Sequence, residues 1–333
     1  MHDRLSPLRQ SLLDDWQRDL PLVPQPFAAI GAALGVTEAT VLAELTALRD
    51  SGAIARVGAT VRPNTVGAST LAALAVPDWR IDEVAAIVGA EPGVNHSYLR
   101  EHDWNLWFVA TGPSRDHLDA TLARIEARTG LSVLDLPLVR AFNLDLGFRL
   151  NGPRGAMQGM ARADETALRP DDAPLIQHLT DGLPLVARPY AALGAALARP
   201  EADVIARIAA LAEAGIVSRL GVIVRHRALG WRSNAMVVWN LPEDRIDAAG
   251  QRLAALPGVT LCYRRRTVPG VWPYGLFSMI HARSRPEALE VLGTAAALPE
   301  LAGADYRALF SVRCFKQTGA LVHQRPAQGI AAE

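Results

Sequence analysis

Three side chains of different chemistry, His96, Tyr98 and Arg100, alternate along one short stretch of the chain. The surrounding residues 94–100 predict a β-strand, and successive side chains of a strand point to opposite faces. The three side chains are therefore expected to share one face. An imidazole, a phenol and a guanidinium in a row supply an acid that titrates near neutral pH, a hydrogen bond and a clamp for an anion. A solvated polar strand would show the same pattern, so the rest of the sequence has to decide.

This strand is the first half of a predicted β-hairpin. Residues 101–103 form the turn, and residues 104–111, rich in aromatic and branched side chains, form the second strand. The turn contains His102, which is a second candidate for the acid. The hairpin thus concentrates two imidazoles beside a phenol and a guanidinium.

A second stretch, residues 259–281, predicts another hairpin and is rich in arginine. Alternation places Tyr263 and Arg265 on one face of its first strand, and Arg264 and Arg266 on the other. Arginines interleaved with flat aromatic rings suit a planar ligand with several carboxylates, because rings stack on the plane while guanidinium groups bind carboxylates bidentately. The candidate binding residues of this group are Arg225, His226, Tyr263, Arg264, Arg265, Arg266, Trp272 and Tyr274.

The chain repeats itself. The segment that begins PLVPQPFAAIGAAL at residue 21 returns as PLVARPYAALGAAL at residue 184, and the same offset relates Gly52 to Gly215 and Gly58 to Gly221. A self-match of this length indicates a fused tandem duplication of a unit of about 140 residues. We expect the two internal repeats to pair with each other, as two separate subunits would in a dimer.

Each repeat predicts an α+β unit, a winged helix-turn-helix followed by a ferredoxin-like βαββαβ domain. In the first repeat the pattern predicts helices at residues 12–20, 26–34 and 38–50, with Thr37 as the N-cap of the third, and then a β-wing from residue 54. The ferredoxin-like elements follow at residues 70–76, 81–89, 94–100, 104–111, 115–129 and 133–142. Their counterparts lie at residues 234–240, 245–256, 259–265, 274–281, 286–297 and 306–315.

The expected domain limits follow from these patterns. They are winged helix-turn-helix domains at residues 1–66 and 174–230, ferredoxin-like domains at 67–150 and 231–318, a linker at 151–173 and a flexible tail at 319–333.

Charge argues against a nucleic-acid partner. The chain has 34 basic and 34 acidic residues, and residues 24–54, which contain the would-be recognition helix, carry one basic side chain, Arg49, against three acidic ones. DNA affinity depends on contacts between phosphates and Lys or Arg. There is no apolar run long enough to span a membrane, no secretory signal and no disulfide framework, so we expect a cytoplasmic protein that binds neither nucleic acid nor membrane.

The motifs HSYLREHDWNLWF and CYRRRTVPGVWPYGLF resemble those of the sirohaem decarboxylases, Lrp/AsnC-like enzymes of the Ahb and Nir D–L fusion type. The resemblance covers nearly the whole chain. It implies removal of CO2 from two acetate side chains of sirohaem, giving 12,18-didecarboxysirohaem for haem d1 or alternative haem biosynthesis. It also implies that no organic cofactor and no metal site of the protein are needed, because the iron arrives with the substrate.

The resemblance carries over residue by residue. The family's His-x-Tyr-x-Arg pattern falls on His96, Tyr98 and Arg100, and its aromatic-Asn-Leu element begins with Trp104 and Asn105, which become substrate-binding candidates. The second repeat has Leu261 and Gly275 where the family pattern has histidine and asparagine. The resemblance therefore implies that the two repeats have diverged, one keeping the acid and the other the arginine-rich clamp.

A decarboxylation of this kind needs an acid, because loss of CO2 leaves a carbanion on the ring-bound CH2. We assign His96 as the acid, with His102 as second candidate, Tyr98 as an orienting group, and Arg100 with Arg264–Arg266 as carboxylate clamps. Either His96 or His226 is an alternative axial contact to the substrate iron.

Two other functions fit parts of the sequence. One is a ligand-responsive DNA-binding regulator of the Lrp/AsnC type, and the other is a tetrapyrrole carrier without chemistry. The oligomeric alternatives are a homodimer and association with related Nir-type subunits.

Overall fold

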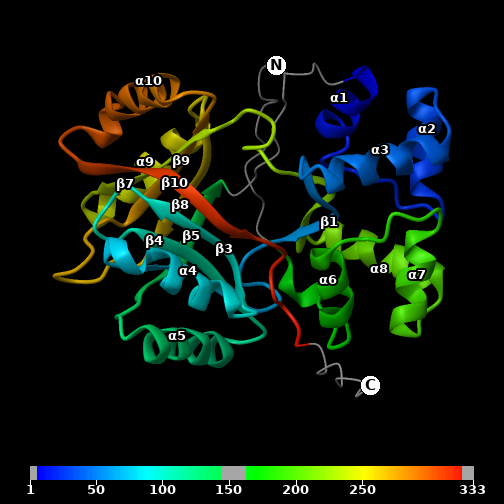
Figure 1. Cartoon of the computed structure of the whole chain (residues 1–333), viewed down its shortest axis with the longest axis horizontal. Helices are drawn as coiled ribbons and strands as arrows, with labels where there is room; N and C mark the ends of the chain where they lie inside the picture. The colour runs from blue at the N-terminus through cyan, green and yellow to red at the C-terminus, as the bar shows by residue number, and fades with distance from the viewer. Residues whose placement is uncertain (1–5, 144–162, 325–333) are drawn as a thin grey trace.

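The computed structural model describes residues 6–143 and 163–324. It has two parts, a β-barrel with helices on its outside and a layer of helices around a small sheet (Figure 1). Both repeats contribute to both parts. The sequence prediction of two helix-turn-helix units and two ferredoxin-like units is confirmed.

Eight of the described strands close the barrel, in the order β10-β3-β4-β2-β5-β8-β9-β7, and all pairings are antiparallel. The first repeat supplies β2 (Ala68–Leu74), β3 (Val94–Arg100), β4 (Leu106–Gly112) and β5 (Leu134–Asn143). The second supplies β7 (Ser233–Asn240), β8 (Val259–Arg265), β9 (Leu276–Ala282) and β10 (Asp305–Gln317).

The last strand of each repeat closes the barrel by crossing into the other repeat. The first half of β5 pairs with β2 of its own repeat, and its second half pairs with β8, where Leu138 lies opposite Arg265. In the same way β10 pairs first with β7 and then with β3, where Ser311 lies opposite Arg100. The expected pairing of the two repeats is thus confirmed, and it takes the form of one shared barrel.

Alternation along the strands separates an outer from an inner apolar cluster. On β4, Leu106 and Phe108 pack with the outer helices α4 (Ile81–Ala90) and α5 (Arg115–Thr129). Trp107 belongs to the inner cluster, together with Trp272 and Phe277. In the second repeat α9 (Glu243–Ala255) and α10 (Arg285–Ala296) cover the outside. The barrel interior is therefore packed with rings on one side of the cavity described below.

The helical layer contains α2 (Pro26–Leu34) and α3 (Glu38–Asp50) of the first repeat and α7 (Pro189–Leu197) and α8 (Glu201–Glu213) of the second. Thr37 caps α3 as predicted, because its side-chain oxygen accepts a hydrogen bond from the backbone N–H of Thr40 at 3.2 Å. The first helix, α1 (Pro7–Asp14), lies earlier than the predicted 12–20, because Ser6 and Pro7 supply an N-terminal start that the apolar pattern alone did not show.

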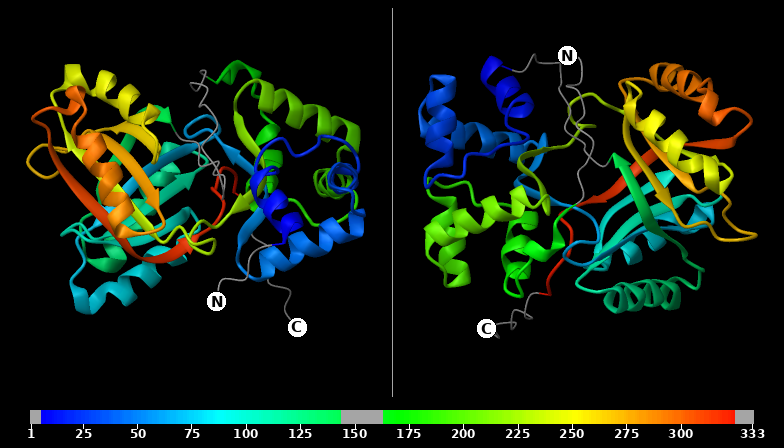
Figure 2. Two further views of the ribbon diagram at one scale, coloured as in Figure 1. Left: turned by 90° about the horizontal axis from the view of Figure 1, so that it is seen from above. Right: turned by 180° about the vertical axis from the view of Figure 1, so that it is seen from behind.

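The predicted β-wings pair in an unexpected way. β1 (Ile54–Val61) pairs with β6 (Val217–Val224) of the other repeat, and Gly58 lies opposite Gly221. We call this two-stranded sheet the wing sheet. The sequence predicted a wing in each repeat but not their pairing, which arises because the apolar side chains of both strands enter a single core shared by the helices of both repeats. Figure 2 shows the wing sheet between the helices and the barrel.

Residues 319–324 correct the expected tail at 319–333. They pack against α6 (Asp172–Asp181), and the backbone N–H groups of Val322 and His323 donate to Gln177 Oε1 at 2.8 and 3.0 Å. Their backbone groups are thus satisfied by a helix that is distant in sequence. Residues 325–333 lie outside the described residues.

The expected linker at 151–173 is described only from residue 163. There a short 3₁₀ turn, η2 (Glu165–Ala167), is followed by α6, so the second helical unit begins two residues before the predicted 174. The buried Asp172 anchors this start through an ion pair with Arg207 at 2.5 Å. The end of the expected first ferredoxin-like domain, residues 144–150, also lies outside the described residues.

In the described part of the chain no helix by itself has the length and apolar character that a membrane crossing requires. Taken together α2 and α3 would have them, but the two helices meet at an angle of 100°.

Candidate functional site

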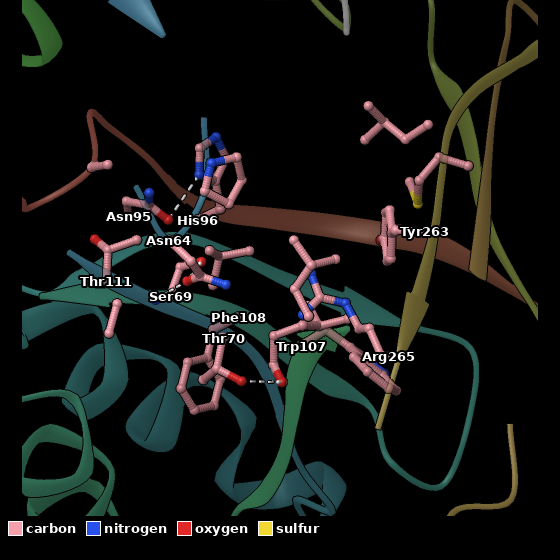
Figure 3. A pocket seen from close by; sticks show the side chains of 18 of the residues that line it. Asn64, Ser69, Thr70, Asn95, His96, Trp107, Phe108, Thr111, Tyr263 and Arg265 are labelled. Atoms are coloured by element: carbon pink, nitrogen blue, oxygen red, sulfur yellow. Dashed lines mark hydrogen bonds between the residues drawn. The ribbon is translucent and has the colours of Figure 1, made fainter. Parts of the chain in front are cut away.

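A cavity of about 330 Å³ lies inside the barrel at the side that faces the wing sheet. The loop between β1 and β2, strands of both repeats and the segment 320–322 line it. Figure 3 shows Asn95 and His96 on one side of this cavity and Tyr263 with Arg265 on the other. The ionisable lining residues that the structure describes include Arg62, Arg100, Arg265, His96 and His281, and none of the described lining residues is an Asp or Glu.

Two tyrosine–arginine pairs occupy equivalent positions in the two repeats. The Arg100 guanidinium lies over the Tyr98 ring at 5.5 Å and donates from Nη1 to the carbonyl oxygen of Leu309 at 3.1 Å. The Arg265 guanidinium lies over the Tyr263 ring at 4.6 Å and donates from Nη1 to the carbonyl oxygen of Leu136 at 2.7 Å. Each carbonyl belongs to the strand that crosses from the other repeat, so the closed barrel is what holds these side chains.

These two arginines are held ready for an anion. The Nε atoms of Arg100 and Arg265 are buried and have no hydrogen-bond partner among the described residues. Burial lowers the pKa of Arg100 to about 10 and lowers that of Arg265 as well. A buried charge without a counter-ion is costly. A carboxylate entering the cavity would offset that cost and satisfy the free N–H groups.

His96 lies at the other side of the cavity, and its Nδ1 is 3.0 Å from Asn95 Oδ1. Alternation predicted that Asn95 points away from His96. A register shift of β3 between Val94 and His96 brings both side chains to the cavity instead. Burial, and then the charge of Arg56, lower the pKa of His96 to about 4. The imidazole is therefore neutral at pH 7 in the ligand-free protein.

His281 on β9 is a site residue that the motifs did not reveal. Its Nδ1 is 2.7 Å from Thr260 Oγ1, and its Nε2 is 3.0 Å from Asn234 Nδ2. Thr260 donates its one hydroxyl proton to the Met279 carbonyl at 3.0 Å, so it accepts the bond from Nδ1–H of His281. No sequence signal marks this residue, because it is the pairing of β9 with β7, where His281 lies opposite Asn234, that brings it to the cavity.

A hydrogen-bond chain connects His281 to the first arginine. Asn234 Oδ1 accepts bonds from Arg100 Nη1 at 3.3 Å and from the Ser311 hydroxyl at 3.1 Å, which leaves its Nδ2 to donate to His281 Nε2. Both nitrogens of His281 are thus engaged in a neutral tautomer. His281 positions Asn234 and Arg100, whereas His96 has one ring nitrogen bonded to Asn95 and faces the cavity.

Two predicted residues of the first hairpin are used elsewhere. The Nδ1 of His102 accepts the backbone N–H of Trp104 at 3.0 Å, and its ring packs against Trp272 outside the cavity. The Asn105 side chain bonds both the N–H and the carbonyl of Val76, at 3.0 and 2.8 Å. The expected roles of His102 as an acid and of Asn105 as a ligand group do not fit these positions.

The predicted stacking rings belong to the barrel core. The Trp272 ring lies 5.1 Å from both the Trp107 ring and the Tyr274 ring, and it is 1% exposed. The Tyr274 hydroxyl bonds to Asp305 at 3.3 Å, and Trp104 packs against the same cluster. None of Trp104, Trp272 and Tyr274 lines the cavity.

The remaining predicted cations do not line the cavity. Arg264 forms an ion pair with Glu243, and Arg266 is exposed, so the predicted opposite face of β8 points away from the cavity. Arg225 and His226 lie in the turn after β6, where the His226 ring is 5.8 Å from the His281 ring. The clamp therefore consists of Arg100 and Arg265, with Arg62 at the cavity edge.

The fold and the cavity define an Lrp/AsnC-like protein with a barrel site for a polyanion. The family model "AsnC-like ligand binding domain" matches residues 66–143 and 228–316, and the model "Siroheme decarboxylase NirDL-like HTH domain" matches residues 9–54 and 172–217. The chain belongs to the siroheme decarboxylase NirDL family.

Proteins that are similar along almost the whole chain support this family assignment. The chain is 65% identical over 311 residues to the siroheme decarboxylase NirDL subunit of Paracoccus denitrificans strain Pd 1222, covering 93% of this chain and 96% of that one. The subunit of Paracoccus pantotrophus is 66% identical with the same coverage. A crystal structure of the siroheme decarboxylase NirDL with an iron-uroporphyrin III analogue has a TM-score of 0.67 and 28% identity, covering 94% of this chain and 92% of that chain.

Proposed function

We propose that this chain is a carboxy-lyase that removes CO2 from two acetate side chains of sirohaem, giving 12,18-didecarboxysirohaem. The observation that carries the proposal is the charge of the cavity. Arg100 is buried and Arg265 is half-buried, neither forms an ion pair with a carboxylate among the described residues, and none of the described lining residues is acidic. Sirohaem carries acetate and propionate side chains on every pyrrole ring, so it supplies the missing counter-ions.

The reaction breaks the C–C bond between the acetate carboxylate and its CH2 group. CO2 leaves, the electron pair stays on the CH2 carbon in conjugation with the macrocycle, and a proton converts that carbon to a methyl group. Each of the two decarboxylations therefore consumes one proton and needs neither an oxidant nor a reductant. Arg100 and Arg265 hold carboxylates that are not being lost, because pairing the scissile carboxylate would stabilise the ground state.

We assign the proton to His96, and its environment explains how the substrate would prepare it. In the ligand-free cavity Arg56 helps to keep the pKa of His96 low. A bound polycarboxylate would oppose that field and raise the pKa, so protonation of His96 would accompany binding. Tyr98 lies two residues after His96 on β3, and we assign it the role of orienting the substrate beside His96. Contact of His96 with the substrate iron is the alternative use of this imidazole.

The proposal also covers what surrounds the reaction. No organic cofactor is needed, since the macrocycle is its own electron sink, and the iron is part of the substrate. We place the enzyme in the cytoplasm. Two such chains, or this chain with related Nir-type subunits, form the proposed larger assembly, whereas the pairing of the two repeats is already built into the barrel.

The alternative of a DNA-binding regulator has little support. Residues 24–54, which contain the would-be recognition helix, carry one basic side chain against three acidic ones. The acidic α3 would also be repelled by phosphates.

The test is anaerobic incubation of the purified protein with sirohaem, followed by mass analysis of the tetrapyrrole. We expect loss of the mass of two CO2 molecules with the wild type and a stall with His96→Ala. A shifted Soret band without any loss of mass would instead show a tetrapyrrole carrier. If the protein causes neither a Soret shift nor a loss of mass, sirohaem is excluded as the ligand.

A further inference from the structure

Two arginines of the wing sheet repeat at equivalent positions and are not used by the barrel site. Arg56 and Arg219 are separated by the same offset as the rest of the repeat, and each precedes the central glycine of its strand by two residues. Because Gly58 and Gly221 lie opposite each other, side-chain alternation places both arginines on one face of the wing sheet.

Arg219 is buried and Arg56 is half-buried, and neither forms an ion pair among the described residues. Arg219 is 8% exposed, and its Nε and Nη1 have no hydrogen-bond partner among the described residues. Arg56 donates from Nη2 to the Ala59 carbonyl at 3.2 Å, and its buried Nε has no described partner. The pKa of Arg56 is lowered to about 10 by burial, and that of Arg219 is lowered to about 10 by burial together with the neighbouring charges of Arg18 and Arg56. Arg56 and Arg219 therefore repel each other, and Arg18, on which Asp19 also acts, adds its positive charge beside Arg219.

This cluster adjoins the barrel cavity. Val61, at the end of β1, and Arg62, which follows it, line the cavity, so the strand that carries Arg56 continues into the cavity wall. The charge of Arg56 also reaches His96, on the cavity side of the barrel. In Figure 1, β1 runs between the helices and the barrel.

A purely structural role does not explain these arginines. The C-terminal end of α6 lies close to Arg56, because a Cβ on Gly182 would lie 3.0 Å from Cβ of Arg56. A cation there can favour the helix dipole. However, no hydrogen bond from Arg56 to a carbonyl of α6 is found among the described residues, so a helix-dipole role does not account for its unpartnered Nε.

We propose that Arg56 and Arg219 bind carboxylates of the tetrapyrrole where it extends from the barrel toward the wing sheet. The proposal rests on the proposed function for the identity of the ligand. The wing sheet then becomes one wall of the substrate site. This gives the helix-turn-helix units of the chain a role in binding a polycarboxylate, and it explains why both repeats have an arginine without a carboxylate partner at this position.

The test compares Arg56→Gln, Arg219→Gln and the double variant with Arg49→Gln. Arg49 is the control, since it is exposed and bonds its neighbour Asp50 at 3.1 Å. Binding is measured by Soret titration with iron-uroporphyrin III, and with iron-coproporphyrin III, which lacks the acetate groups. Thermal unfolding of each ligand-free variant is measured in parallel.

We expect each single substitution to weaken binding of iron-uroporphyrin about tenfold, and the double substitution more, with a smaller dependence on salt. The ligand-free Tm should stay the same or rise, because an uncompensated charge is removed. Wild-type affinity in the double variant, or a fall in Tm without loss of affinity, would show that the arginines are structural and overturn the proposal.

The outcome is separable from the proposed reaction. If the wild type fails to decarboxylate sirohaem while the variants still lose affinity for iron-uroporphyrin, the carboxylate site stands and the reaction assignment falls. If the wild type decarboxylates sirohaem and the double variant binds like Arg49→Gln, the reaction assignment stands and the carboxylate site at the wing sheet falls.

Discussion

The two repeats build the same tyrosine–arginine pair but differ at the position of the acid. Tyr98 and Arg100 correspond to Tyr263 and Arg265, and both arginines donate to a carbonyl of the strand that crosses from the other repeat. His96, by contrast, corresponds to Leu261, which also lines the cavity. The tyrosine–arginine pair, which occurs in both repeats, suits a ligand with carboxylates on both sides. His96, which occurs in one repeat, suits proton transfer. The comparison teaches that binding and catalysis are separable in this barrel.

Replacing the unique histidine should have the largest effect. We expect His96→Asn to lower the rate of decarboxylation at least about 100-fold, because general acid catalysis contributes about 10²–10⁴. Affinity for iron-uroporphyrin should stay close to that of the wild type, since both arginines remain. Single-turnover mass analysis and Soret titration measure the two effects. Leu261→Asn is the matched control and should leave the rate nearly unchanged; equal losses in both variants would contradict the assignment of one acid.

The symmetric arginines should instead affect binding, and equally. Arg100→Gln and Arg265→Gln should each weaken binding of iron-uroporphyrin by about 10–100-fold, the value of one charge-assisted contact. Lysine should not restore it, because an ammonium lacks the bidentate fork. Arg264→Gln, on the outer face of the same strand, is the control. A large effect at one arginine and none at the other would break the symmetry argued above.

The sequence predicted the bounds of single helices and strands well, and the contacts between distant segments poorly. The bounds of β3, β8, α2 and α5 agree with the pattern, because strand alternation, helical spacing and caps are local signals. Closure of the barrel, the pairing of β1 with β6 and the place of His281 depend on contacts between distant segments. No residue type marks such contacts. Asn95 escaped prediction for a smaller reason, since one irregularity in β3 changes which side chains reach the cavity.

The motif also predicted more ligand groups than the cavity has. Arg264, Trp272 and Tyr274 have the right chemistry, but alternation and the packing of the barrel core direct them elsewhere. Arg100 and Arg265 were correctly placed, because the face of a regular strand follows from the sequence alone. Residue type thus predicted the kind of ligand, and only the fold selects the side chains that reach it.

The acid should also make the stability of the protein depend on pH. The pKa of His96 is about 4 in the folded protein, against about 6.5 for an unfolded histidine. The unfolded state therefore binds more protons between these values, and the free energy of unfolding falls as the pH drops from about 6.5 toward about 4. We expect wild type to lose about 1–2 kcal/mol more than His96→Asn between pH 7 and pH 5 in urea unfolding. Identical pH profiles would mean that the imidazole is not held neutral.

The smallest effect is expected at Asn105 and at its counterpart Gly275, which directly precede β4 and β9. Asn105→Ala removes both side-chain bonds to the backbone of Val76 and should cost about 1 kcal/mol of unfolding free energy. Binding and turnover should not change, because Asn105 is not part of the cavity wall. The reverse change, Gly275→Asn, should gain nothing, since a Cβ there would lie 3.1 Å from Cδ1 of Ile246 and force that side chain to move. Thermal unfolding and Soret titration of both variants decide the point. A loss of affinity in Asn105→Ala would return this residue to the substrate site and extend the difference between the repeats beyond the acid.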